Sequence, residues 1–390
     1  MITPDAKNSS AFPGDNDQAE TIEQKKAELL QQQLLTGTID KQEEPEITRE
    51  QLSIGKRLLN WRTLVPLAVV IFALLYIARS ANVNPQQTWN IIRTANIGFF
   101  LAAFLIYYAS FPIRALRWRL LLENAGFNKA NGVQLPALWK LAEIVYISFF
   151  ANVVVPARLG EVYRAYLLRQ ETGLSASRSF GTVLAERLLD LIVLVLLLIT
   201  AIMVSLHENL PPELLLGLKV TVALVISGVL GLFTLRLMRD RVAKIIPARF
   251  RNHYNHFQEG TLGSFRRLPA LSGLTVAVWA CESLRFYFIA LALNLISGDP
   301  LHIVAAACFI GLGEALLTII PFTAGGVGLV EAGMAAMILL FNPATPNAAN
   351  LSVAAVALDR TISLLSIWVI GFIVFLIAFG RQATRAPKKS

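Results

Sequence analysis

Long apolar runs recur along the sequence from residue 64 to residue 379, and they restrict the chain to a small set of folds. A helix of about 20 apolar residues crosses a hydrocarbon core about 30 Å thick, since a helix rises about 1.5 Å per residue. The chain is 55% hydrophobic, with a mean hydropathy of +0.56. The sequence therefore predicts an all-α integral membrane protein, a polytopic helical bundle of about six full spans, at 64–80, 97–116, 177–206, 214–236, 271–296 and 351–379.

Both ends of the chain are polar. Residues 1–60 are rich in Gln, Glu, Asp and Lys, which predicts a cytoplasmic and mostly disordered region with a short surface helix at 17–35. Residues 61–380 make up the predicted transmembrane domain, and residues 381–390 a cytoplasmic tail.

Basic residues indicate how the spans are oriented. The net charge is +9, and Lys and Arg gather at 56–62, within 236–267 and after residue 380. Arg114, Arg117 and Arg119 are predicted to end the second span on the same side. The positive-inside rule then orients the protein with both termini in the cytoplasm. The loop 80–96 is predicted to lie on the outer side of the membrane. Arg93 lies in this loop and Arg79 just before it, and neither fits this pattern.

Several classes of protein and site are disfavoured. The chain has no aromatic-rich basic patch and no zinc spacing, so no nucleic-acid partner is predicted. Cys281 and Cys308 both lie in apolar segments, which predicts neither a disulfide framework nor a metal site. His253 and His256 lie three apart in the basic loop without a further ligand. The sequence predicts no metal and no cofactor.

Two segments predict helices that break inside the membrane. Residues 141–155 make a helix of only about 22 Å, and arginines follow it that would face outward if it crossed fully. A re-entrant pair of half-helices fits better, because irregular backbone at membrane depth must be sheltered by protein or a wet cavity. The second pair is predicted at 302–320 and 327–341. The predicted break residues are Pro156, Gly160, Pro321, Gly325, Gly326 and Gly328.

The two halves of the membrane domain, 61–207 and 214–380, show the same order of span, span, broken pair and span. Three crossings per half predict an inverted-topology repeat, an arrangement with which many transporters build a site near the bilayer midplane. Arg114 is matched with Arg285, and the pair Glu186-Arg187 with Asp359-Arg360. Each break has a Pro followed by Gly and then Glu.

Charged residues within apolar segments predict a polar cavity. A charge at the centre of a membrane helix costs about 2.5–3.5 kcal/mol on insertion scales, and the planar fork of Arg binds phosphate through two hydrogen bonds. Mutual salt bridges are the alternative for any single pair, such as Glu161 with Arg164 or Glu282 with Arg285. The predicted substrate-binding residues are Arg114, Arg158, Glu161, Arg164, Arg187, Asp190, Glu282, Arg285, Glu314, Glu331, Asp359 and Arg360.

Three motifs together carry a resemblance: P-x-R-x-G-E at 156–161, E-R-x-x-D at 186–190 and P-x-x-x-G-G-x-G-x-x-E at 321–331. In this order, over about 60–380, the chain resembles the transmembrane region of lysylphosphatidylglycerol synthase, also called the flippase-like domain. The resemblance implies an inner-membrane protein that moves a lipid with a modified or phosphorylated head group. Glu161, Arg187, Asp190, Glu331 and Arg360 match positions of the family motifs.

The resemblance covers the membrane module alone. The chain ends ten residues after the last predicted helix, so we expect neither the aminoacyl-transfer domain of the synthase nor a soluble glycosyltransferase domain.

The predicted function is translocation of a lipid between leaflets, its head group anionic or zwitterionic and its class a phospholipid or a polyprenyl-phosphate-linked lipid. Membrane lipids are the predicted partners, and a separate lipid-modifying enzyme is a candidate partner. One alternative is a secondary transporter for a small water-soluble anion. Another is a membrane enzyme acting on head groups, with Glu161 or Glu331 as general base. Because no nucleophile–His pair or metal cluster falls within the spans, the sequence predicts a protein that is not an enzyme.

Overall fold

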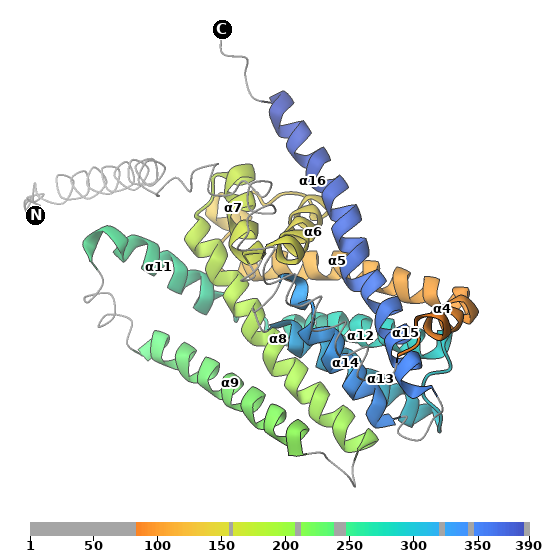
Figure 1. The fold of residues 1–390 in the computed structure, drawn as a ribbon. Coiled ribbons are helices and arrows are strands. Elements are labelled where there is room, and N and C mark those ends of the chain that lie inside the picture. The colour runs from red at the N-terminus through yellow and green to blue at the C-terminus, as the bar shows by residue number, and fades with distance from the viewer. Residues whose placement is uncertain are drawn as a thin grey trace, which may run out of the picture. The chain divides into compact units, whose positions relative to one another are not determined.

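The computed structural model describes residues 83–155, 159–206, 212–237, 247–319, 324–341 and 347–385, all within one compact unit, Ile54–Ser390. Every regular element in these residues is helical (Figure 1). The predicted polar region 1–60, the predicted span 64–80, and Pro156, Arg158 and Pro321 lie outside the described residues.

Six helices of the described residues are long and apolar enough to cross a membrane. This confirms the all-α polytopic class. They are α5 (Ile97–Asn124), α8 (Ala176–Ser205), α9 (Pro212–Leu237, apolar from Leu215), α12 (Leu268–Ala292), α13 (Pro300–Ile319) and the continuous run of α15 (Ala348–Arg360), a π-helical turn (Thr361–Leu365) and α16 (Ser366–Arg385), apolar to Ala378.

The two broken pairs differ in length. The first consists of α6 (Leu138–Val154) and α7 (Gly160–Thr172), with 17 and 13 residues, which agrees with the predicted short halves. The second consists of α13 and α14 (Leu329–Phe341). Here α13 has 20 residues and meets the length of a full span by itself, because its apolar run begins as early as Pro300.

The helix pair α5 and α12 forms the centre of the bundle (Figure 1). The two helices are antiparallel. The backbone N–H of Asn96, before α5, donates to the carbonyl of Ala292 at 2.9 Å, and Asn124, the last residue of α5, donates through Nδ2 to the carbonyl of Ser264 at 3.1 Å. Asn96 also caps α5 by accepting hydrogen bonds from the N–H groups of Gly98 and Phe99. At its other end, α5 continues to Asn124, eight residues beyond the predicted end at 116.

Two further helices lie in segments predicted as loops. Helix α4 (Pro85–Thr94) lies between the first two predicted spans, and Asn350 on α15 holds it through a 2.7 Å hydrogen bond from Nδ2 to Gln87 Oε1. Helix α11 (Ala248–Gly263) lies in the basic segment 236–267 and packs against α8. Because α11 is polar along most of its length, its hydropathy did not separate it from a loop.

Close contact between α11 and α8 depends on Gly260. A Cβ at Gly260 would overlap the carbonyl oxygen of Arg178. We expect Gly260→Ala to lower the free energy of unfolding by about 1–3 kcal/mol, because overpacking against backbone cannot be relieved by a rotamer change. Thermal unfolding of the purified protein measures the change. Gly273→Ala, where nothing lies within 4 Å of the added Cβ, is the matched control, and equal stability of the two variants would contradict the prediction.

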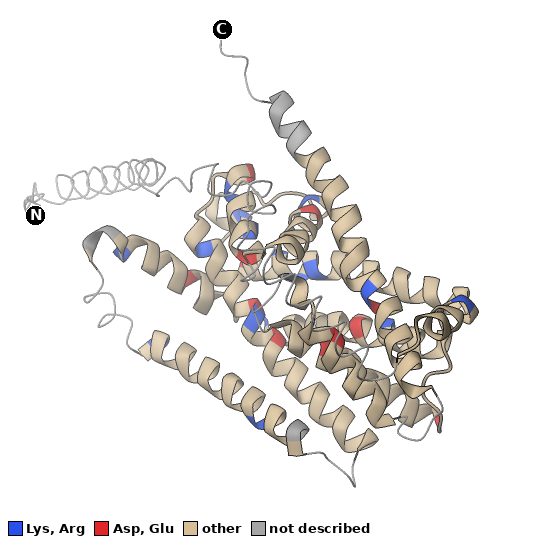
Figure 2. Cartoon of the chain, in the orientation of Figure 1, with Lys and Arg blue, Asp and Glu red and all other residues tan. Residues whose placement is uncertain are grey.

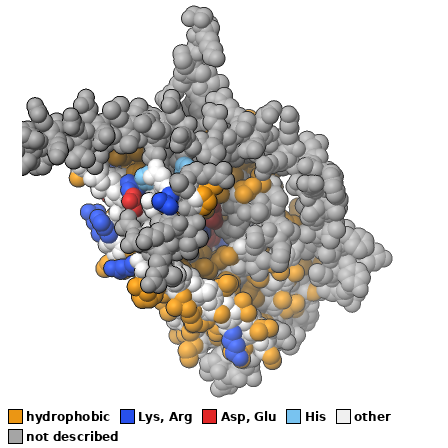
Figure 3. Space-filling model, turned by 90° about the vertical axis from the view of Figure 1, so that its left-hand side faces the viewer, with side chains coloured by type: hydrophobic (Ala, Val, Ile, Leu, Met, Phe, Trp, Pro, Cys, Tyr) orange, Lys and Arg blue, Asp and Glu red, His pale blue; other side chains and the backbone are white. Residues whose placement is uncertain are grey.

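Helix α9 presents apolar side chains to its surroundings. Leu216, Leu224, Leu230 and Phe233 are all more than half exposed. Figure 3 shows the broad hydrophobic area on the face that includes α9, with charged side chains and His gathered above it. An exposed apolar belt of this kind is what lipid contact requires.

Candidate functional site

Charged residues of the membrane helices gather where α5, α7, α8 and α12 meet the second broken pair, while most of α9 and α16 carries none (Figure 2). They form two ion networks. The first ion network comprises Arg117, Glu161, Arg164, Glu186, Arg187 and Asp190. The second ion network comprises Arg114, Glu282, Arg285, Glu314, Glu331, Asp359 and Arg360.

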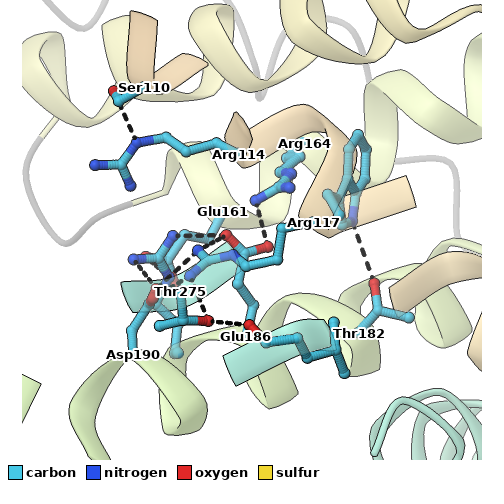
Figure 4. Close-up of polar contacts among 12 residues, drawn as sticks. Ser110, Arg114, Arg117, Glu161, Arg164, Thr182, Glu186, Asp190 and Thr275 are labelled. Atoms are coloured by element: carbon cyan, nitrogen blue, oxygen red, sulfur yellow. Dashed lines mark hydrogen bonds and ion pairs between the residues drawn. The ribbon is translucent and has the colours of Figure 1, made fainter. Parts of the chain in front are cut away.

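Arg117 occupies the centre of the first ion network (Figure 4). Its Nη2 donates to Glu186 Oε1 at 2.7 Å, and its Nη1 donates to Asp190 Oδ1 at 2.5 Å and to Thr275 Oγ1 at 3.1 Å. Glu186 and Asp190 are four apart on α8 and so share one face of that helix. The Arg117 side chain is 0% exposed, so three helices fix its charge away from solvent.

Arg164 reaches the same network from α7. Its Nη1 lies 2.9 Å from Glu186 Oε2, and its guanidinium stacks 3.9 Å from the centre of the Trp118 ring. Trp118 is fixed in turn, because its Nε1 donates to Thr182 Oγ1 at 3.3 Å. Although Arg164 is only 1% exposed, its Nε and Nη2 have no hydrogen-bond partner among the described residues.

Arg187 and Glu161 form the more accessible end of the first network. Arg187 Nε lies 3.3 Å from Glu161 Oε1, and Nη1 lies 3.4 Å from Asp190 Oδ2. Their side chains are 25% and 19% exposed, against 2% for Glu186. This pair links α7, which follows the first break, to α8.

Arg285 has the central place in the second ion network. It contacts Glu314 at 2.5 Å and Glu282 at 3.3 Å, and its Nη1 donates to Asp359. These carboxylates come from α13, α12 and α15. The guanidinium of Arg285 also lies over the ring of Tyr107 on α5, 5.5 Å from its centre.

Arg360 joins the second network to the second break. Its Nε donates to Glu331 Oε1 at 2.7 Å, and its Nη2 donates to the carbonyl oxygen of Gly325 at 2.7 Å. Gly325, Gly326 and Gly328 all have positive φ, at 64°, 72° and 95°, a conformation that glycine adopts without the penalty other residues incur. The turn thereby directs a carbonyl at the arginine. A π-helical turn begins at the next residue, Thr361.

The two networks are connected in the same way. Arg117 on α5 binds Glu186, and Arg285 on α12 binds Asp359. The arginine after each of these acids, Arg187 or Arg360, binds the glutamate that follows the break, Glu161 or Glu331. By this pattern of contacts Arg117, rather than the predicted Arg114, resembles Arg285, while the repeat itself stays a prediction.

Arg114 instead pairs across the bundle centre. Its Nη2 lies 2.5 Å from Glu282 Oε1, and each of these residues stands three positions before the central arginine of its own half. Arg117 was overlooked because the second span was predicted to end near residue 116, which placed Arg117 at the membrane surface. Its spacing of one helical turn from Arg114 was the available signal.

The structure places the predicted site residues in definite roles. Glu282 and Arg285 pair, as their spacing predicts. Arg164, however, contacts Glu186 rather than Glu161, because α8 lies within its reach. The described charges are paired with one another rather than spread along an open chamber, which matches the salt-bridge alternative for this conformation. Within the described residues, no group of His, Cys, Asp and Glu is arranged to hold a metal ion.

The fold and the two networks define a multi-pass helical membrane protein with paired charges sheltered in its interior. The family described as the lysylphosphatidylglycerol synthase TM region matches residues 63–371. The chain belongs to this family.

Relatives extend this comparison. A UPF0104 membrane protein of Methanocaldococcus jannaschii is 33% identical over 240 residues, which cover 61% of this chain and 98% of the relative. A UPF0104 membrane protein of Pyrococcus horikoshii is 28% identical over 306 residues, which cover 71% of this chain and 86% of the relative. Glycosyltransferase AglD of Haloferax volcanii is 24% identical over 379 residues, covering 87% of this chain and 58% of AglD.

The AglD match corrects one prediction. The expectation of a protein that is not an enzyme rested on finding no catalytic constellation in the spans. A relative that aligns with 87% of this chain is named a glycosyltransferase, so this architecture occurs in a protein named as an enzyme. Searching the spans for a nucleophile–His pair or a metal cluster was too narrow a criterion for the whole class.

Proposed function

We propose that the protein moves a lipid with an anionic or zwitterionic head group, a phospholipid or a polyprenyl-phosphate-linked lipid, between the leaflets of the cytoplasmic membrane. The two halves would act as an inverted repeat, with both termini in the cytoplasm. The polar region 1–60 and the tail 381–390 belong to this proposal as cytoplasmic segments.

The main support is the state of Arg164. Buried donors in proteins nearly always have an acceptor, and an exception points to an absent water or ion. Arg164 Nε and Nη2 are buried without one among the described residues, and a guanidinium presents such N–H groups in the geometry that matches two phosphate oxygens. A head-group phosphate would supply the absent acceptors.

The second half provides an internal comparison. Arg164 stands three residues after Glu161, and the residue three after Glu331 is Met334, which is 0% exposed. Among the described side chains of the second ion network, none has a buried polar atom without a partner. The first network is therefore the better candidate for anion binding, and the second for holding the helices together.

The pairs Glu161–Arg187 and Glu331–Arg360 are the natural places for opening. Each joins a helix that follows a break to the last long helix of its half, and each is more exposed than the acid at the network centre. An incoming anion that replaces a glutamate on its arginine would release the hairpin without leaving a buried guanidinium unpaired.

Reconstitution tests this function. Purified protein in liposomes should carry fluorescently tailed phosphatidylglycerol, phosphatidylcholine or polyprenyl phosphate across the bilayer faster than protein-free liposomes, as dithionite quenching measures. Liposomes holding an unrelated polytopic protein control for bilayer disturbance. Rates equal to these controls for all three lipids would refute lipid translocation. Uptake of inorganic phosphate without lipid movement would favour the small-anion carrier instead.

The name of the AglD relative favours a second candidate, a part in glycosyl transfer to a membrane lipid. Mass spectrometry of lipids that copurify with the protein distinguishes the candidates. A glycosylated lipid that accumulates only when the protein is supplied with sugar donor would favour transfer, and a lipid bound unchanged would favour translocation.

A further inference from the structure

A polar pocket of about 550 Å³ lies outside both ion networks. It opens where the end of α5, the start of α8 and helix α11 come together. Its lining includes Asn124, Asn131, Arg178, Gln258, Glu259 and Arg266. Figure 3 shows charged side chains and His gathered on this side of the molecule, above the apolar area. The pocket is lined by the end of α5 and by the basic segment 236–267, both on the side predicted to face the cytoplasm.

Three amide side chains in the lining have fixed orientations. Asn124 Nδ2 donates to the carbonyls of Ser264 at 3.1 Å and Arg266 at 2.5 Å. Asn131 Nδ2 donates to Gly126 O at 2.8 Å, and Gln258 Nε2 donates to Leu235 O at 2.6 Å. Since carbonyls can only accept, these bonds establish which end of each amide is the NH₂ group. The amide oxygens are left as acceptors.

Gln258 gives the strongest indication that a ligand belongs here. The residue is 1% exposed, and its Oε1 has no hydrogen-bond partner among the described residues. A buried amide oxygen without a donor costs stability unless another group supplies one. The pocket therefore suits a ligand that brings several hydrogen-bond donors.

The charge of the lining selects hydroxyl groups over an ammonium group. Arg178 and Arg266 are positive and Glu259 is negative, and Glu259 is already the ion-pair partner of Arg178. A cationic ligand would meet a net positive wall, whereas neutral hydroxyls would donate to the amide oxygens. We propose that this pocket binds the sugar of a sugar phosphate head group.

Position links the pocket to the first ion network. Asn124 lies seven residues from Arg117 along α5, and Arg178 lies eight residues from Glu186 along α8, so the separation is about 10–12 Å on both helices. One part of this inference rests on the proposed function, namely that the sugar is attached to a translocated lipid. A lipid whose phosphate moves toward Arg164 would leave the pocket as it enters the network.

Direct binding tests the pocket without transport. Glucose 1-phosphate, inorganic phosphate and phosphoethanolamine are titrated calorimetrically into the full chain held in nanodiscs. We expect glucose 1-phosphate to bind most tightly. Asn131→Ala and Gln258→Met should each weaken its binding about tenfold, because each removes one acceptor for a hydroxyl. Lys129→Ala, next to the pocket in sequence but not in its lining, should have no effect.

The outcomes separate this inference from the proposed function. Three results would overturn the sugar assignment, whatever the transport assay shows. Inorganic phosphate could bind as tightly as glucose 1-phosphate, or phosphoethanolamine could bind most tightly. The third such result is that both pocket variants bind glucose 1-phosphate as tightly as the parent protein. If the protein also translocates lipid, both variants should slow a polyprenyl phosphate hexose while changing the rate of polyprenyl phosphate less than twofold. Slowing of both lipids alike would count against the pocket, and movement of neither would count against translocation alone.

Discussion

Arg117→Met is expected to lower the free energy of unfolding by about 3–5 kcal/mol, because it takes the nearest cation away from two buried carboxylates. Glu186 and Asp190 are both nearly inaccessible, and Arg117 is the closest cation to each, at 2.7 and 2.5 Å. Methionine is long enough to fill most of the space but carries no charge. Temperature-dependent size-exclusion chromatography of the detergent-solubilised protein measures the loss.

Two variants make this prediction specific. Arg119→Met lies on the same helix and removes only the pair with Glu123, whose side chains are 37% and 34% exposed, so its effect should be below about 1 kcal/mol. The double variant Arg117→Met, Asp190→Asn removes one cation and one of its carboxylates, leaves Glu186 paired with Arg164, and should recover part of the stability. If Arg117→Met unfolds at the same temperature as Arg119→Met, the first network does not hold the helices together.

Arg164→Met is expected to slow translocation of a phosphate-bearing lipid by about 100-fold or more. Hydrogen bonds to charged groups contribute about 1.5–3 kcal/mol each, and two of them are available from Nε and Nη2. Folding should survive, because Glu186 keeps Arg117 as a partner. The substitution also gives this position the residue that the second half has at Met334. The liposome assay described above measures the rate.

Met334→Leu is the matched control, an apolar exchange at the corresponding place of the other half, and should leave the rate within about twofold. Arg164→Lys keeps the charge but not the planar guanidinium, so its translocation rate should lie between those of Arg164→Met and Met334→Leu. A folded Arg164→Met protein that moves lipid at the parent rate would remove the support for anion binding at the first network.

Hydropathy and spacing predicted the helical class, the position of α8 and α9, and the short first pair. Hydropathy and spacing failed where a helix is polar or where it continues past a charged residue. Hydropathy treats an arginine as the end of a span, since it records the cost of an isolated charge, yet Arg117 continues α5 because two carboxylates from α8 neutralise it. Helix α11 was overlooked because its buried residues include Gln258, Gly260 and Thr261, which do not form an apolar stripe.

Most members of the two networks were predicted as site residues, Arg117 and Glu186 being the exceptions, but most of their pairing was not. Glu282 and Arg285 are close in sequence, and their pairing could be predicted from helical geometry. Arg164 with Glu186, and Arg285 with Glu314 and Asp359, depend on how distant helices pack. The substrate-binding role of these residues, and the inverted relation of the halves, stay predictions that the variants above address.

One turn of α5 serves both networks, with Arg114 reaching Glu282 of the second and Arg117 reaching Glu186 of the first. Sliding α5 along α12 would therefore disturb ion pairs of both networks at once. The central helix pair is thus suited to stay in place, and in the proposed transport the two hairpins outside it would be the parts that move.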